Sequence, residues 1–192
     1  MTTRYLDFEN SLKDIDKKIN ESQNEKEKEK LLIKKDEVCN KIYSNLNAWQ
    51  KVQIARHPER PHTIHYIESL FSNFLLIAGD KKFADDQAII SGFAKFQNKS
   101  VLVLGTEKGN DVKTRIKHNF GMAKPEGYRK AERLYKLASR FNLPIICFID
   151  TAGAYPGKEA EERGQAEAIA SLISVSLRTN TPIISIIIGE GG

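Results

Sequence analysis

The chain has 192 residues, 40% hydrophobic and 29% charged, which suits a folded protein with a buried core and excludes a disordered one. Its longest apolar run, residues 183–188, is far shorter than the roughly 20 residues of a membrane-spanning helix, and no apolar signal segment follows Met1, so we expect a cytoplasmic protein. The formal net charge of +5 does not predict a nucleic-acid partner, because basic residues alternate with acids and no nucleic-acid-binding motif accompanies them.

The amino-terminal segment has the spacing of helices. Apolar residues recur at intervals of three and four, first at Tyr5, Phe8, Leu12, Ile15 and Ile19 and again at Leu31, Val38, Ile42, Leu46 and Trp49. The stretch between them, residues 21–30, is almost entirely polar and reads as a solvated connection. We therefore expect residues 1–55 to form a hairpin of two antiparallel helices.

A proline-rich corner follows, and it marks a boundary near residue 56. Pro58 and Pro61 each disfavour helix at the preceding residue. Next, Ile64, Ile67, Leu70, Phe71 and Phe74 predict an amphipathic helix that ends at Gly79 and Asp80. Residues 88–96 and 101–104 then read as strands joined by a polar turn. The second domain is expected to cover residues 56–192.

The remainder alternates helices and strands. Residues 125–141 and 158–178 predict helices, and the apolar runs at 145–149 and 183–188 predict strands buried on both faces. A strand, a helix and a further strand without a tight hairpin predict a right-handed parallel crossover. The fold class is therefore α/β.

Glycine-containing loops follow three of these strands, at residues 105–109, 150–157 and 189–192. In parallel α/β proteins ligands bind beyond the carboxyl ends of the strands, and glycine leaves backbone N–H groups uncovered, so the loops suit a developing oxyanion. Each loop alone could be an ordinary turn, but three on one side favour a site. The loops match neither a P-loop nor a dinucleotide fingerprint, and Ser185 lacks the glycines of a nucleophile elbow.

Metal and disulfide chemistry are not predicted. Cys39 and Cys147 form no spaced cluster, so we expect free thiols. His57, His62 and His65 surround the proline corner without a cysteine or acidic ligand at metal spacing.

Many short strings occur along the chain in one characteristic order. They are LDFE at 6–9, AWQ at 48–50, ARHPERP at 55–61, NFGM at 119–122, PEGYRKA at 125–131, FIDT at 148–151, GAYPG at 153–157, AEERGQ at 160–165 and IGEGG at 188–192. In these strings the chain resembles the alpha subunits of bacterial-type acetyl-CoA carboxylase carboxyltransferases over essentially its whole length.

The resemblance implies a crotonase-like (ClpP/crotonase) core behind the helical hairpin, with the domain incomplete at its carboxyl terminus. It implies a biotin-dependent carboxyltransferase subunit, which moves the carboxyl group of carboxybiotin to acetyl-CoA and forms malonyl-CoA for fatty acid biosynthesis. No cofactor is bound covalently, since carboxybiotin and acetyl-CoA are substrates, and zinc is expected only on the beta subunit. The implied partners are that beta subunit, in a heterotetramer of two alpha and two beta chains, the biotin carboxyl carrier protein and biotin carboxylase.

The resemblance also implies the site residues. Gly153, Ala154 and Tyr155 are expected to line the biotin-side wall, with Gly191 and Gly192 at the edge of an oxyanion loop whose glycine pair lies beyond residue 192 in the family. Arg56 and Arg129 are expected to face CoA or to be structural, and an anionic CoA would also account for the positive charge. One further departure is Ala152, where many relatives have proline.

Two alternatives stay open at this stage. The chain could be a truncated scaffold that binds the beta subunit without catalysis, or a component of another acyl-CoA enzyme such as a biotin-dependent carboxylase or a decarboxylase. Because a chain ending on a buried strand would expose apolar surface and an open sheet edge, we expect it to aggregate or to be inactive alone. The helical hairpin and the Arg-His-Pro corner favour the alpha subunit.

Overall fold

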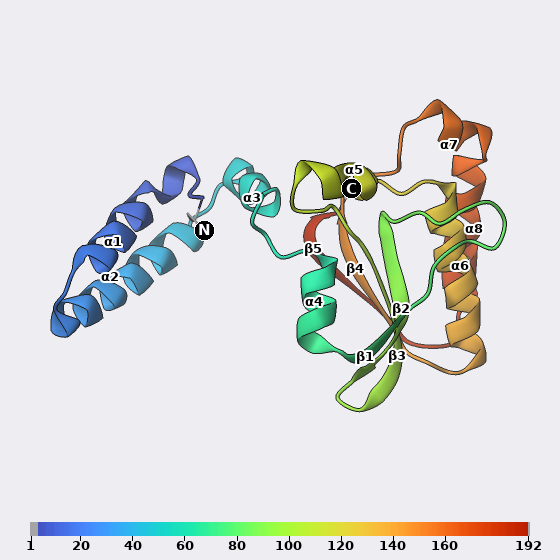
Figure 1. Ribbon diagram of the computed structural model, residues 1–192, viewed down its shortest axis with the longest axis horizontal. Helices are drawn as coiled ribbons and strands as arrows, with labels where there is room; N and C mark the ends of the chain where they lie inside the picture. Colours follow the sequence, from blue (N-terminus) through green and yellow to red (C-terminus); the bar gives the residue numbers. More distant parts are fainter. Residues whose placement is uncertain (1–3, 192) are drawn as a thin grey trace. The chain divides into compact units, whose positions relative to one another are not determined.

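The computed structural model describes residues 4–191, and the chain divides into two compact units between Glu59 and Arg60. Figure 1 labels the helices and strands in chain order. Within the described range, no helix is long and apolar enough to cross a membrane.

The first unit is helical. A short 3-10 turn, Asp7–Glu9, leads into α1 (Asn10–Glu21), which packs against α2 (Glu25–Tyr43) and buries Leu12 and Ile15. These two helices form a hairpin over residues 10–43. Lys35 of α2 also contacts Asp16 of α1, with 2.6 Å between Nζ and Oδ1.

Two details of this hairpin differ from the prediction. The polar stretch is mostly helix, because α2 begins at Glu25, where the Asn24 side chain accepts a hydrogen bond from the N–H of Lys26. Trp49 does not continue α2. It lies on a separate helix, α3 (Ala48–Ala55), which Asn47 caps through a reciprocal pair of hydrogen bonds with Gln50.

The second unit is built on one five-stranded sheet in the order β1-β2-β3-β4-β5. Its strands are β1 (Ser72–Leu76), β2 (Ile89–Phe96), β3 (Lys99–Thr106), β4 (Ile145–Thr151) and β5 (Ile183–Gly191). The first three strands are antiparallel neighbours, whereas β3, β4 and β5 run parallel. Gln97 and Asn98 form the predicted turn between β2 and β3, with φ values of 46° and 66°.

Helices cover both faces of this sheet. On one face α6 (Pro125–Arg140) packs on β3 and β4 and alongside α8 (Gln165–Arg178), as Figure 1 shows. On the other, α4 (Thr63–Leu70) packs Ile67 against Val103 and Phe148. The remaining helices are α5 (Val112–Lys117), a 3-10 turn at Asn119–Gly121, and α7 (Lys158–Glu162). The sheet thus lies between two helical layers.

Three predicted elements were wrong in part. Phe74 belongs to strand β1, since α4 ends at Leu70 and Asn73 adopts a positive φ of 55°. The helix expected over residues 158–178 is broken at Gly164, whose φ of 78° is left-handed. Strand β5 is not buried on both faces, because it lies at the sheet edge and Ile184 and Ile187 are 52% and 65% exposed.

Candidate functional site

The three glycine-containing loops meet at the end of the sheet that is formed by the carboxyl ends of its parallel strands. Because β3, β4 and β5 are parallel, their carboxyl ends point the same way, and the loops that begin there lie together. Hydrogen bonds join them: the N–H of Asp150 donates to the Thr106 hydroxyl (2.6 Å), and the N–H of Glu190 donates to Asp150 Oδ1 (2.8 Å). The loops after β3, β4 and β5 are therefore directly connected to one another.

A lysine at the centre of this end of the sheet joins the ends of two strands. The Nζ of Lys108 lies 2.7 Å from Asp150 Oδ1 and 2.6 Å from Glu190 Oε2. The three side chains are 18%, 3% and 17% exposed, so the ion pairs are shielded from solvent. We call Lys108, Asp150 and Glu190 the lysine clamp. It ties the loop after β3 to the loops after β4 and β5.

Glycines make room for the clamp. A side chain at Gly189 would collide with the carboxylate of Asp150, and one at Gly121 would lie 2.7 Å from the Lys108 side chain. Gly121 also has a φ of 78°, which favours glycine. These two positions therefore leave the room that the clamp needs.

A buried carboxylate fixes the loop that carries Lys108. Glu107 accepts hydrogen bonds from the N–H groups of Ile64 (3.1 Å) and Gly109 (2.9 Å), and its Oε1 lies 3.1 Å from His62 Nδ1. Burial alone would raise the pKa of Glu107, but these hydrogen bonds outweigh it and hold the pKa below its usual value. The base of the clamp is thus anchored to the start of α4.

The loop after β4 is held by its own backbone and by one glutamine. The Thr151 hydroxyl donates to the carbonyl of Gly153 (2.9 Å) and accepts from the Gly153 N–H (3.1 Å). The Tyr155 N–H donates to the carbonyl of Ala123 (3.0 Å), and the Gln165 amide bridges the carbonyls of Ala123 and Tyr155. Gly153 adopts a φ of 135°, so the turn requires glycine.

The N–H of Ala154 stays open in the turn of this loop. The N–H groups of Gly153 and Tyr155 are both used inside the loop, whereas the N–H of Ala154 has no acceptor among residues 4–191. Ala154 is half-buried, in a turn whose shape its neighbours determine. An unpaired, rigidly held N–H is what a developing oxyanion needs.

The other predicted residues do not belong to this loop. Gly191 pairs with Thr151 at the end of β5, whereas Gly192 lies outside the described residues. Arg129 is 14% exposed, donates to the Arg163 carbonyl and faces Asp80 and Glu167 at 4.0 and 3.9 Å.

Arg56 is exposed at the end of α3, in the first unit. No set of three His, Cys, Asp or Glu side chains in the described part of the chain is placed to hold a metal ion.

The lysine clamp was missed from the sequence. The loops at 105–109, 150–157 and 189–192 were predicted to meet, but no role was assigned to the charged residue in each of them. The signal was present: a lysine follows one strand, and an acid follows each of the next two parallel strands. Opposite charges at one end of a sheet predict an ion pair there.

Residues 5–192 match the model of the family described as acetyl co-enzyme A carboxylase carboxyltransferase-like. The chain is 53% identical, over 198 residues, to the acetyl-coenzyme A carboxylase carboxyl transferase subunit alpha of Rhizobium rhizogenes, covering 98% of this chain and 62% of that protein. It is 51% identical, over 196 residues, to the same subunit of Paramagnetospirillum magneticum, covering 97% of this chain and 62% of that protein. The chain thus spans less than two thirds of the length of these relatives.

Solved structures with a similar fold include the beta subunit of Pseudomonas aeruginosa geranyl-CoA carboxylase, with a TM-score of 0.55 and 18% identity over 70% of this chain and 23% of that one. Another is the transcarboxylase 12S hexamer, with a TM-score of 0.57 and 16% identity over 69% of this chain and 24% of that one. These similarities confirm the α/β crotonase-like fold class that the sequence predicted.

Proposed function

Because the chain belongs to the family of acetyl-CoA carboxylase carboxyltransferase alpha subunits, we propose that it forms the biotin-side wall of an active site that converts acetyl-CoA to malonyl-CoA. Residues 1–55 are proposed as an appended helical hairpin, and residues 56–192 as the first part of the catalytic domain. The observation that carries the proposal is the open N–H of Ala154, in a loop beside the lysine clamp.

The reaction creates negative charge on two oxygens. As the bond between a biotin nitrogen and the carboxyl carbon breaks, charge moves onto the ureido oxygen of biotin. The biotin anion then takes a methyl proton from acetyl-CoA, and the enolate that this produces forms the new carbon–carbon bond with the released carbon dioxide. A fixed N–H directed at either oxygen lowers the barrier, because it needs no reorganisation as charge develops.

We assign the Ala154 N–H to the ureido oxygen of biotin. Gly153 and Tyr155 hold the loop in shape, and Gly191 borders the same wall from β5. Gly192 is proposed to continue this wall. The contacts of Arg129 with the Arg163 carbonyl and with Asp80 support a structural role rather than direct contact with CoA.

The proposed partners follow from the family. They are a carboxyltransferase beta subunit, which carries zinc and completes a heterotetramer, a biotin carboxyl carrier protein that delivers carboxybiotin, and biotin carboxylase in the full complex. We propose that the protein works in the cytoplasm and that ATP is consumed by the biotin carboxylase rather than at this site.

A reconstitution assay tests this function. The protein that carries this sequence is mixed with the beta subunit, and biotin-dependent decarboxylation of malonyl-CoA is followed as the reverse half of the reaction. We expect the rate to rise clearly above that of the beta subunit alone and to fall to background without biotin, because both walls are needed to stabilise the two anions.

Two results would contradict the proposal. A rate equal to that of the beta subunit alone, although the two proteins bind each other, would indicate a scaffold without catalysis. Faster turnover of a branched malonyl thioester than of malonyl-CoA would indicate a component of another acyl-CoA carboxylase.

A further inference from the structure

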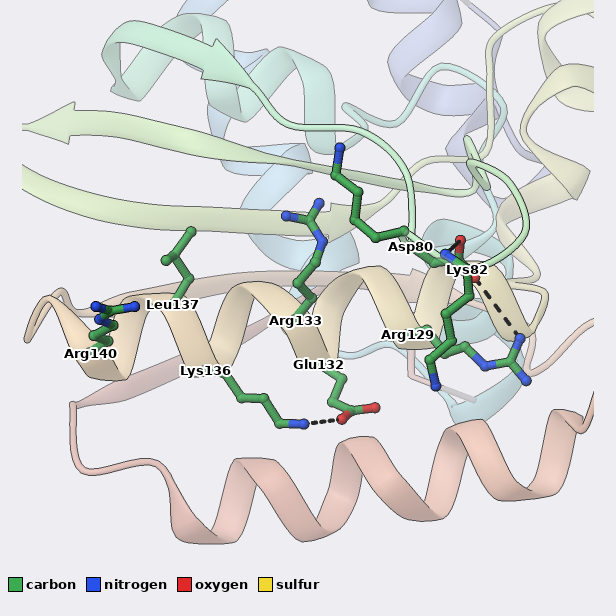
Figure 2. Close-up of a pocket in the computed structure, with 9 residues that line it drawn as sticks. Asp80, Lys82, Arg129, Glu132, Arg133, Lys136, Leu137 and Arg140 are labelled. Carbon is green, nitrogen blue, oxygen red and sulfur yellow. Dashed lines mark hydrogen bonds and ion pairs between the residues drawn. The ribbon is translucent and has the colours of Figure 1, made fainter.

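A basic groove runs along α6, on the part of the helix that does not pack against the sheet. It has a volume of about 490 Å³ and six cationic side chains in its wall: Lys81, Lys82, Arg129, Arg133, Lys136 and Arg140. Figure 2 shows Arg129, Asp80 and Lys82 at one end of the helix and Leu137 and Arg140 at the other. We call it the α6 groove.

The sequence of α6 places these charges on one side of the helix. Arg129, Arg133, Lys136 and Arg140 are spaced by four, three and four residues, whereas Lys130, Leu134 and Ala138 are buried between the helix and the sheet. From Arg129 to Arg140 the helix rises by about 16 Å. The positive charge therefore extends over three turns rather than gathering at one point.

The turn that carries the two lysines is held in place by Asp80. Its Oδ1 accepts hydrogen bonds from the N–H groups of Lys82 (2.9 Å), Phe83 (2.8 Å) and Ala84 (3.1 Å). Burial alone would raise the pKa of Asp80, but these hydrogen bonds and Arg129 hold it below its usual value. The turn is thus a defined part of the groove wall.

Most of the positive charge in the groove is not neutralised. Lys136 pairs with Glu132, and Arg129 lies 4.0 Å from Asp80, but Arg133 donates only to the neutral carbonyls of Ala78 and Gly79. Among the described residues, the side chains of Lys81, Lys82 and Arg140 form no salt bridge, although the charge of Lys82 helps to lower the pKa of Glu132. Six cationic and two acidic side chains leave an excess of four positive charges.

This arrangement favours a small polyanion. Charges of one sign in a concave site strengthen the local potential, and guanidinium and ammonium groups bind phosphate well. The volume lies within the roughly 300–1,000 Å³ of small-molecule pockets. A single phosphate would leave most of the six cations unmatched, whereas Leu137 offers apolar contact to an uncharged part of a ligand.

We propose that the α6 groove binds a small molecule that carries two or more phosphate groups. The groove shares only Arg129 with the residues expected at the active site, so this proposal does not depend on the proposed function. Two exposed cations, Lys82 and Arg140, are the most useful positions for a test, because no salt bridge of the described residues is lost when they are replaced.

Isothermal titration with inorganic tripolyphosphate tests the proposal, in the protein that carries this sequence. The double variant Lys82→Glu/Arg140→Glu should weaken binding by at least about tenfold, because two attractive charges become repulsive. A matched control is Lys95→Glu/Lys99→Glu, which makes the same change of net charge at exposed lysines of the β2–β3 hairpin. We expect the control to bind within about twofold of the unaltered protein.

Three results would overturn the proposal: no saturable binding of tripolyphosphate, equal weakening in both double variants, or tighter binding of an acidic peptide of the same charge. The last result would assign the groove to a protein partner. Circular dichroism of each variant separates a loss of binding from a loss of folding.

Discussion

Replacing Lys108 with methionine should lower the free energy of unfolding of the second unit by about 2–3 kcal/mol. The change leaves the carboxylates of Asp150 and Glu190 adjacent without their shared cation. Breaking a fully buried ion pair costs about 3–5 kcal/mol, and the partial exposure of this clamp reduces that value. Urea denaturation followed by circular dichroism measures the change. Tryptophan fluorescence would not follow unfolding of the second unit, because the single tryptophan, Trp49, lies in the first unit.

A surface ion pair provides the control. Lys158 lies 3.3 Å from Glu162 but is 89% exposed, so Lys158→Met should cost less than about 0.5 kcal/mol. The triple variant Lys108→Met/Asp150→Asn/Glu190→Gln removes the stranded charges and should regain at least half of the lost stability. If Lys108→Met proved as mild as Lys158→Met, the clamp would not hold the strand ends together.

The variant Ala154→Pro should lower kcat of the reconstituted carboxyltransferase about a hundredfold, with little change in KM for acetyl-CoA. Proline removes the single N–H of the loop that we assign to the ureido oxygen, and losing one such donor costs about 10²–10³ in kcat. Steady-state malonyl-CoA formation at saturating carrier protein measures both constants.

A second proline in the same loop controls for backbone effects. Ala152 is exposed, two residues away, at a position where we expect proline in many relatives. Ala152→Pro should therefore keep kcat within about threefold of the unaltered protein. Equal losses in the two variants would mean that loop shape, and not the Ala154 N–H, determines the rate.

The parts of the fold that follow a simple period were predictable. The apolar run at 145–149 became the buried inner strand β4, and Pro125 begins α6 as expected. The turn at Gln97 and Asn98 followed from its polar residues between two apolar runs. In these segments the local pattern and the tertiary packing favour the same structure.

The elements that were predicted wrongly depend on contacts between residues distant in sequence. Phe71 and Phe74 are three residues apart, which suggests a helix, but residues 72–76 instead supply the antiparallel partner of β2. The break at Gly164 lets Arg163 reach the buried Glu126, 2.6 Å from Nε to Oε1. The spacing of hydrophobic residues along the chain does not indicate such contacts.

The candidate site was predictable as a place but not as chemistry. Parallel strands bring their carboxyl ends together, so the meeting of three loops followed from topology alone. Topology alone did not predict which N–H groups stay open. That depends on the hydrogen bonds of the Thr151 hydroxyl and the Ala123 carbonyl, which use the N–H groups of Gly153 and Tyr155 and leave that of Ala154.

The most direct test of the central claim is a crystal structure of the carboxyltransferase that contains this chain with biotin bound. The distance of interest joins the ureido oxygen of biotin to the backbone nitrogen of Ala154. We predict about 2.7–3.1 Å, the range for a donor that stabilises an oxyanion. A ureido oxygen bound elsewhere, with the Ala154 nitrogen still unpaired, would contradict the assignment of this loop to the biotin side.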